Sequence, residues 1–258
     1  MGGQYRIAAD IGGTFTDIAL ITGDDVLRTW KLPSTPANYA DAVIEGVTAL
    51  MAELSLPLGE IDQVLHGCTI ATNAILEHKG ANTALLTTKG FRDVLEMRRV
   101  RVPRLYEPLY VKPPPLAPRQ RRFEVDERMG ARGEVVRPLD MTSVEQAVAA
   151  VKRHGCDAVA VCLLNSYTNP THEQQIGEVL QRELPGCFIS LSVDTLPQMR
   201  EYERTSTTVV NAYVGPPVKA YLQSMMDQLS AAGVNGRLMV MQSSGGILDA
   251  SAVIDKPS

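Results

Sequence analysis

The sequence predicts an α/β fold, and three observations lead to that class. Short apolar segments of strand length alternate with longer segments in which apolar residues recur every three or four positions. The first seven segments follow the order strand, strand, strand, helix, strand, helix, strand, which is typical of an α/β unit and not of a sandwich or a bundle. The chain has 258 residues, 45% of them hydrophobic and 21% charged, enough for one large globular domain or two smaller ones.

The opening segments predict three antiparallel strands joined by glycine-containing turns. Gly12 and Gly13 separate the first two strands, and Gly23 begins the turn before the third. Pro36 lies near the start of the helix that follows, a place where the missing N–H of proline is tolerated. The strands are expected at residues 5–11, 15–21, 26–31, 64–68 and 83–87, and the helices at residues 37–54 and 69–79.

Residues 90–140 have a different character, with seven prolines and many arginines. We expect an ordered insertion or arm with little regular structure beyond edge strands. The strand–helix alternation then resumes, so we predict two domains, 1–140 with the insertion at 90–140, and 141–258 as a second α/β unit. In this second part, helices are expected at 143–154 with Thr142 as the cap, at 170–184 and at 200–229 with a break at Gly215-Pro216-Pro217, and strands at 158–164, 188–193 and 237–241.

Charge and cysteine content restrict the function classes. The net charge of −4 and the pI near 5.6 do not favour nucleic acid or an acidic membrane as a partner. The four cysteines are scattered without C-x-x-C spacing, which fits reduced thiols in a cytosol. No signal peptide or membrane-length apolar run is present, so we expect a soluble, cytoplasmic protein. The abrupt end at Ser258 favours a fragment of a longer protein over a natural short tail.

The stretch Asp10–Asp17, which reads D-I-G-G-T-F-T-D, predicts a phosphate-binding hairpin. The two glycines allow positive φ angles and leave room for an anion to approach the backbone. The backbone N–H groups of Gly12 and Gly13 and the hydroxyls of Thr14 and Thr16 are the expected donors to phosphate oxygens.

Asp10 lies at the end of a buried strand, and its carboxylate is not a favourable contact for phosphate. The position makes sense if Asp10 holds Mg²⁺, directly or through water, and the metal bridges the phosphates. An ordinary hairpin with Gly-Gly at its turn is the alternative. The preceding aspartate and the two hydroxyl residues favour phosphate binding.

Two further segments bear candidate ligand contacts. Gly245 and Gly246 follow the last predicted strand, the usual place for a ligand-facing loop in an α/β sheet, although a simple turn is equally compatible. The arginine-rich part of the insertion favours a subunit contact or an anionic substrate, with a plain exposed loop as the alternative. Cys68 has no nucleophile-activating partners beyond His66 and is expected to be a buried small side chain.

Several sequence blocks together resemble the N-terminal portion of the hydantoinase A/5-oxoprolinase family, which includes the β subunits of acetone carboxylases. The resemblance covers essentially the whole chain. Two small departures from the family pattern are Cys68, where threonine is more usual, and Ser244, where asparagine is more usual. The matching blocks are Asp10–Asp17, His66–Glu77, Gly90–Arg99, Arg122–Arg128, Asn169–Glu173, Arg200–Val214 and Met241–Gly246.

The resemblance implies a ribonuclease H-like fold of the actin, hexokinase and Hsp70 type, a mixed sheet with flanking helices. In that fold two α/β domains close on ATP, and each supplies one phosphate hairpin. A second hairpin motif does not occur in these 258 residues, so the chain would hold one side of the cleft. We therefore expect the isolated fragment to be inactive, because phosphoryl transfer depends on positioning from both sides.

The resemblance also implies an activity. ATP, with Mg²⁺, would phosphorylate the oxygen of a cyclic amide such as a hydantoin or 5-oxoproline, and the phosphorylated ring would then open by hydrolysis. The alternatives are the β subunit of an ATP-dependent acetone or ketone carboxylase and a non-catalytic nucleotide-binding module of the actin or Hsp70 type. A second, hydantoinase B-type subunit is the expected partner.

The same resemblance assigns roles to individual residues. Asp10, Asp17 and His66 are the predicted catalytic residues, with Asp10 as the metal ligand and Asp17 orienting the hairpin or a water. Thr69 and Asn73 are the predicted substrate contacts. Helix capping alone would explain Thr69, and a structural role would equally explain His66.

Overall fold

The computed structural model describes residues 5–12, 14–23, 25–35, 39–100, 106–107, 109–242 and 245–255. The chain forms two compact units: unit 1 comprises Met1–Lys79 and Pro217–Pro257, and unit 2 comprises Gly80–Pro216. Two units were predicted, but the boundary at residue 140 lies inside unit 2. The chain returns to unit 1 because its last strands pair with the N-terminal sheet, a long-range contact that local sequence patterns do not reveal.

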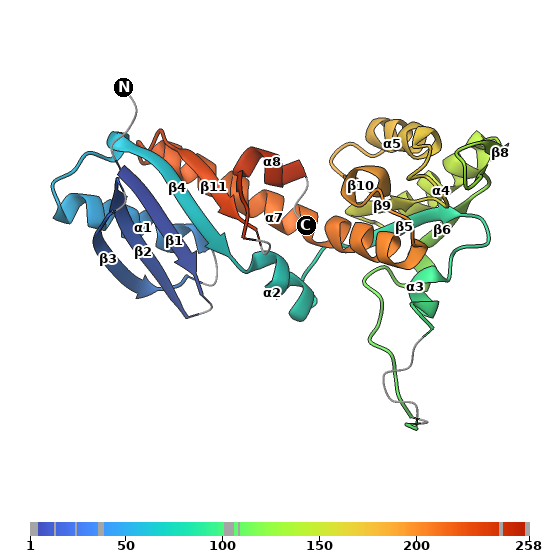
Figure 1. Ribbon diagram of the computed structural model, residues 1–258, viewed down its shortest axis with the longest axis horizontal. Coiled ribbons are helices and arrows are strands. Elements are labelled where there is room, and N and C mark those ends of the chain that lie inside the picture. The colour runs from blue at the N-terminus through green and yellow to red at the C-terminus, as the bar shows by residue number, and fades with distance from the viewer. Residues whose placement is uncertain are drawn as a thin grey trace. The chain divides into compact units, whose positions relative to one another are not determined.

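Unit 1 is built on a mixed six-stranded sheet with the strand order β12-β11-β4-β1-β2-β3 (Figure 1). β1 is antiparallel to β2 and parallel to β4, and β4 is parallel to β11, so the carboxyl ends of β1, β4 and β11 meet at one edge. The three antiparallel opening strands are thereby confirmed. The strands are β1 (Tyr5–Ile11), β2 (Phe15–Thr22), β3 (Asp25–Pro33), β4 (Ile61–Cys68), β11 (Arg237–Met241) and β12 (Ile247–Asp249).

One face of this sheet is buried and the other is open. Ile7, Ile18 and Val64 lie on the buried face, and helix α1 (Tyr39–Glu53) packs over β1, β2 and β3. Gly46 of α1 allows this close approach, because a Cβ there would lie 2.3 Å from Ile18 Cδ1. The remaining elements of unit 1 are η1 (Leu58–Glu60), α2 (Ile70–Leu76) and α8 (Ala250–Asp255), which packs on β11 and β12.

Helix α7 (Glu201–Ala231) is continuous, so the predicted break at Gly215-Pro216-Pro217 is wrong. A proline inside a helix has no N–H to donate to the carbonyl four residues earlier. For Pro217 that carbonyl belongs to Tyr213, and it accepts a hydrogen bond of 2.9 Å from the backbone N–H of Ala81. The carbonyl that the proline leaves free is satisfied from outside the helix, and the helix continues.

Unit 2 is built on a four-stranded parallel sheet with the order β10-β9-β5-β6. Helices cover both faces of this sheet, and all five residues of β9 are buried. A strand that is buried on both faces has a continuous apolar sequence. Its strands are β5 (Thr83–Thr88), β6 (Arg122–Val125), β9 (Ala158–Cys162) and β10 (Phe188–Leu191), and its helices besides α7 are α3 (Val94–Met97), η2 (Arg119–Arg121), α4 (Met141–Arg153), α5 (Thr171–Glu183) and α6 (Ser192–Thr195).

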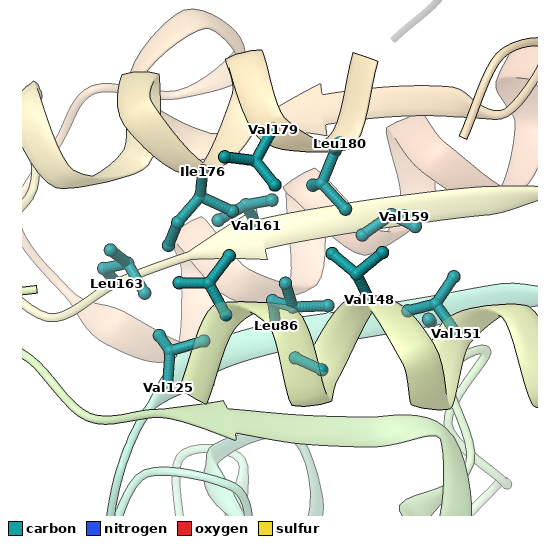
Figure 2. Packing of buried hydrophobic residues seen from close by; sticks show 13 residues of the cluster. Leu86, Val125, Val148, Val151, Val159, Val161, Leu163, Ile176, Val179 and Leu180 are labelled. Carbon is teal, nitrogen blue, oxygen red and sulfur yellow. The ribbon is translucent and has the colours of Figure 1, made fainter. Parts of the chain in front are cut away.

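The core of unit 2 lies between the sheet and two helices. Figure 2 shows Val148 from α4 and Ile176 and Leu180 from α5 converging on Val159 and Val161 of β9. The opposite face of the sheet packs against α3 and the first half of α7. The burial of apolar side chains on both faces therefore stabilises the parallel sheet.

The insertion at 90–140 contains more regular structure than predicted. β6 joins the parallel sheet as an edge strand, and β7 (Arg128–Met129) and β8 (Val135–Arg137) form a small antiparallel pair. The cap of α4 is Asp140, not Thr142: its carboxylate accepts hydrogen bonds from the N–H groups of Thr142 and Ser143 at 3.1 and 3.3 Å. Asp140 precedes the helix by one position, which is where a capping side chain reaches those donors.

Leu180→Ala should destabilise unit 2 by about 2–5 kcal/mol, because it removes a fully buried side chain and leaves a cavity. Val136→Ala, at a position that is 62% exposed, is the matched control and should change the free energy of unfolding by less than about 0.5 kcal/mol. Urea denaturation followed by circular dichroism measures both. Equal midpoints for the two variants would contradict the packing described for α5.

Candidate functional site

The Asp10–Asp17 segment forms a hairpin that presents two carboxylates on the open face of the unit 1 sheet. Asp10 and Asp17 are directly opposite each other in the β1–β2 pairing, so their side chains share one face. Both residues are exposed. Lys31 of β3 pairs with Asp17 at 3.0 Å. Among the described residues, Asp10 has no hydrogen-bond or ion-pair partner and is free to bind a cation.

The tip of the hairpin is braced by Ser34, which follows β3. The Ser34 hydroxyl donates to the carbonyl of Gly12 at 2.8 Å, and its N–H donates to the carbonyl of Thr14 at 2.9 Å. The N–H of Gly12 donates to the carbonyl of Phe15 at 3.0 Å. The hydroxyl of Thr16 lies 3.0 Å from that of Ser34. These bonds tie the described residues on both sides of the turn to the end of β3.

The bracing changes what each predicted phosphate contact can contribute. Thr14 is exposed, and no hydrogen bond to its hydroxyl occurs among the described residues. Thr16 is fully buried and bonded to Ser34, so its geometry favours support of the tip over direct phosphate contact. The N–H of Gly12 is already used within the turn. Gly13 lies outside the described residues.

A cavity of about 770 Å³ lies on the open face beside the two aspartates. Its walls are mainly apolar and include Ala8, Leu65, Met241 and Ile247. Gly67, at the carboxyl end of β4, lies beside Asp10: a Cβ at this position would be 3.1 Å from Asp10 Oδ1. The glycine therefore preserves the space around the Asp10 carboxylate.

The Asp10 and Asp17 carboxylates suit Mg²⁺ better than a metal ion whose ligands all come from protein side chains. In the part of the chain that the structure describes, no group of three or more His, Cys, Asp or Glu residues could hold a metal ion. Mg²⁺ is usually bound through one or two carboxylates, with waters and substrate phosphates completing its shell. Asp10, unpaired and exposed, offers one such ligand, and Asp17 lies opposite it in the hairpin.

His66 lies on the buried face of the sheet, opposite to Asp10. It is 1% exposed; its Nδ1 lies 3.3 Å from the carbonyl of Ala9, and its Nε2 lies 2.8 Å from the hydroxyl of Tyr221 on α7. The carbonyl can only accept, so Nδ1 carries the proton and Nε2 accepts from the tyrosine. Burial lowers the pKa of His66 to about 4. This setting is that of a neutral structural histidine, and its catalytic role stays a prediction.

The predicted substrate contacts lie where β4 ends and α2 begins. Thr69 is the N-cap of α2, but its side chain makes no capping hydrogen bond. Instead, Asn73 Nδ2 donates to the Thr69 hydroxyl at 3.2 Å. The two side chains thus form a polar pair at the same sheet edge as Asp10, and their contact with a substrate stays a prediction. The side chain of Cys68 lies outside the described part of the structure.

The loop between β11 and β12 ends at that edge as well. Gly245 has a φ of 84°, and its N–H donates to the carbonyl of Gln242 at 2.9 Å. The N–H of Gln242 donates to the carbonyl of Gly246 at 2.8 Å, which closes a tight turn. Both glycines are exposed. The turn explains the glycine at position 245 without a ligand, and the cofactor contact stays a prediction.

Comparisons with known proteins agree with this arrangement. Residues 6–184 match the hydantoinase/oxoprolinase N-terminal region, and residues 204–258 match hydantoinase/oxoprolinase. The chain belongs to the hydantoinase/oxoprolinase family. The resemblance found in the sequence motifs is thereby confirmed.

The relatives of this chain include a caprolactamase subunit, a 5-oxoprolinase and a carboxylase subunit. It is 33% identical to caprolactamase subunit alpha of Pseudomonas jessenii and 33% identical to 5-oxoprolinase 1 of Arabidopsis thaliana, over 95% of its length in each case. It is 32% identical to the acetophenone carboxylase gamma subunit of Aromatoleum aromaticum over 94% of its length. The chain spans 36%, 22% and 35% of these three relatives.

A solved structure supports the fold. The crystal structure of the ATP-dependent caprolactamase from Pseudomonas jessenii matches with a TM-score of 0.87 and 32% identity, covering 94% of this chain and 36% of that chain. The α/β class with a mixed sheet and flanking helices is therefore confirmed. Among the described helices, none combines the length and the hydropathy of a membrane-spanning segment.

Protonation of His66 should cost stability as the pH falls. The folded state holds this side chain neutral down to about pH 4, whereas the unfolded chain binds the proton near 6.5. The contribution of His66 is therefore fully present above pH 6.5 and is lost as the pH falls towards 4, by on the order of 3 kcal/mol. The free energy of unfolding of His66→Gln should depend less on pH between 7 and 4.5. The exposed His154→Gln is the control; parallel pH profiles for wild type and His66→Gln would refute the assignment.

Proposed function

We propose that this chain is the nucleotide-binding part of an ATP-dependent enzyme that opens a cyclic amide. The observation that carries the proposal is the exposed, unpartnered Asp10 carboxylate beside a glycine hairpin tip that Ser34 holds in place. Family membership supports it, as do the ATP-dependent caprolactamase structure and the 5-oxoprolinase relative. ATP would phosphorylate the carbonyl oxygen of the amide and leave as ADP. Water would then add to the activated carbon, the C–N bond of the ring would break to leave an acyl phosphate, and a second water would release phosphate.

Each residue at the hairpin has a role in this proposal. Asp10 would hold Mg²⁺, which offsets the charge of the phosphates when bound. Thr14 would donate its hydroxyl to a phosphate oxygen, together with the backbone of the tip. Thr16 would act through Ser34 by fixing the turn. Asp17, paired with Lys31, would orient a water or the hairpin itself.

The proposal also includes a substrate site and a partner subunit. Thr69 and Asn73, at the sheet edge beside the hairpin strands, would line the substrate site. Gly245 and Gly246 would lie against the nucleotide. Two of the relatives carry the word subunit in their names, which supports a second, hydantoinase B-type subunit as the partner. A cytoplasmic location stays a prediction.

A ketone carboxylase subunit is the second candidate. The acetophenone carboxylase gamma subunit is nearly as similar to this chain as the caprolactamase subunit. Here ATP would activate a ketone oxygen before attack on a carboxyl donor. ATP turnover by the complete protein that depends on a cyclic amide supports the first candidate, whereas turnover that depends on a ketone and bicarbonate supports the second. A nucleotide-gated module without chemistry would show neither.

Asp10→Asn should lower the affinity of the chain for MgATP by at least about tenfold, a loss of ~1.4 kcal/mol. The amide keeps the shape of the side chain but removes the negative charge that a hard cation requires. The same substitution should abolish ATP turnover in the complete protein. Isothermal titration calorimetry and an ATPase assay measure the two effects.

Asp25→Asn is the matched control. Asp25 is exposed at the start of β3, at the end of the strand opposite to the β1–β2 turn. It should bind MgATP as wild type does. The proposal fails if Asp10→Asn keeps the wild-type affinity and turnover. Circular dichroism spectra of both variants establish that the fold is intact.

A further inference from the structure

An arm of unit 2, residues 98–112, follows α3 and carries the most exposed large apolar side chains among the described residues. Val100, Tyr106, Leu109 and Val111 are between 83% and 97% exposed. In Figure 1 the described part of the arm, drawn in green, extends away from the unit 2 sheet. Single exposed apolar side chains are common on protein surfaces, whereas several together mark an interaction site.

The base of the arm is fixed by polar contacts between its two ends. The Arg98 guanidinium donates to the carbonyl of Pro113. Lys112 Nζ donates to the carbonyl of Glu96 at 3.1 Å. The three consecutive prolines Pro113–Pro115 follow, and the ring of each restricts its φ angle. A segment that is fixed before binding loses less conformational entropy in a complex, so its side chains contribute more to affinity.

A cavity of about 390 Å³ lies at the base of the arm, between α3 and the start of α7. Phe91, Val94 and Met97 give it an apolar wall. Val100 of the arm lines the same cavity, so the arm and the cavity form one continuous surface. The side chains that dominate the affinity of protein interfaces fill pockets of this kind.

The cavity at the base of the arm is positively charged. Arg99 Nε lies 2.7 Å from Glu203 Oε1, so the charges of this pair cancel. Arg98 and Arg200 also line the cavity, and within the described part of the chain neither has a carboxylate at ion-pair distance. Glu201 is the remaining acidic residue of the lining. The lining is therefore positive by one charge.

The arm is basic although the chain is acidic. Residues 98–112 contain five basic residues and one acidic residue, whereas the net charge of the chain is −4. Complementary charge guides association and excludes wrong partners. Tyrosine, methionine and arginine, which occur here as Tyr106, Met97 and Arg98, are enriched at protein interfaces. A protein surface that fits the arm therefore combines acidic and apolar side chains.

We propose that the arm and the cavity at its base bind an acidic, apolar surface of a second subunit. Tyr106, Leu109 and Val111 pack against apolar side chains of that subunit. One of its acidic side chains enters the cavity and lies between Arg98 and Arg200. The inference rests on the proposed function, in which a hydantoinase B-type subunit is the partner, and it identifies the part of this chain that contacts the partner.

Isothermal titration calorimetry of the complete protein with the purified hydantoinase B-type subunit tests the proposal. Tyr106→Ser/Leu109→Ser changes two exposed side chains, so the fold should stay intact while subunit binding weakens. We expect a loss of at least about tenfold in affinity, or ~1.4 kcal/mol. Val135→Ser/Val136→Ser, at two exposed apolar positions of β8, is the matched control and should bind the subunit as wild type does.

Arg200→Gln tests the contribution of charge in the same titration. Raising the NaCl concentration from about 0.05 M to about 0.5 M should weaken wild-type binding, because salt screens the attraction between the two surfaces. The affinity of Arg200→Gln should be lower at low salt and should fall less as salt is added. The same salt dependence in both proteins would contradict an acidic partner group at the cavity.

Equal subunit binding by wild type and Tyr106→Ser/Leu109→Ser, with intact circular dichroism spectra, would overturn this inference and leave the partner of the proposed function in place. No binding of the subunit to wild type would overturn both, while the MgATP titration of Asp10→Asn still decides the nucleotide site.

Two further results would assign the arm to another occupant and overturn the inference. The first is unchanged subunit binding by Tyr106→Ser/Leu109→Ser together with a smaller oligomer in analytical ultracentrifugation, which would make a second copy of the protein the occupant. The second is unchanged subunit binding together with loss of binding to vesicles of anionic phospholipid, which would make a membrane surface the occupant.

Discussion

The position of β1 between β2 and β4 is the constraint on which the proposed nucleotide site of unit 1 depends. Antiparallel pairing with β2 places Asp10 opposite Asp17 and forces a tight turn between them. Parallel pairing with β4 places Gly67 beside Asp10, where a larger residue would contact the carboxylate. Because β11 runs parallel to β4, the loop after it reaches the same edge. One strand thus brings together side chains that are distant in sequence.

Unit 2 stabilises the carboxyl edge of its own sheet in a different way. The buried Glu173 carboxylate accepts hydrogen bonds from the N–H groups of Leu163 and Val193 and from the hydroxyls of Ser166 and Ser192. Burial raises its pKa, and these bonds oppose the increase.

Arg204 joins this network through Ser166, whose hydroxyl accepts from Arg204 Nη1 at 2.9 Å. A polar network in a low-dielectric interior fixes the loops that it connects. Among the described residues of this network, Arg204 Nε has no acceptor, and Arg204 lines a small pocket at the carboxyl edge of the sheet.

The local patterns of the sequence were sufficient to predict most elements. β1 and β11 have the predicted bounds. A short apolar segment between turn residues is a strong sequence signal for a strand. Two errors have physical causes: the Tyr213 carbonyl that Pro217 leaves free is bonded to Ala81, so α7 continues, and Asp140 caps α4. The division into units could not be predicted, since it depends on the pairing of β11 with β4 across a long stretch of chain.

The candidate site was predictable only in part. The glycines and acidic residues of Asp10–Asp17 form a compact motif whose chemistry can be read from the sequence. The supporting residues carry no such signal: Ser34 lies beyond a third strand, and Tyr221 reaches His66 from a helix 155 positions away. Alternation along β4 places His66 on the face opposite to Gly67, which strand periodicity predicts only once the buried face is known.

The most direct test of a nucleotide site at Asp10 replaces Mg²⁺ by paramagnetic Mn²⁺ in a complex of ATP with the isotopically labelled chain. Mn²⁺ broadens the NMR signals of nuclei close to it, so no turnover is needed. Metal bound through Asp10 should broaden the amide signals of Asp10, Thr14 and Gly67 much more than that of Asp25, which pairs with Thr22 at the opposite end of β2 in the same unit. Broadening that leaves Asp10 and Gly67 unaffected, or that is the same throughout unit 1, would contradict the site described.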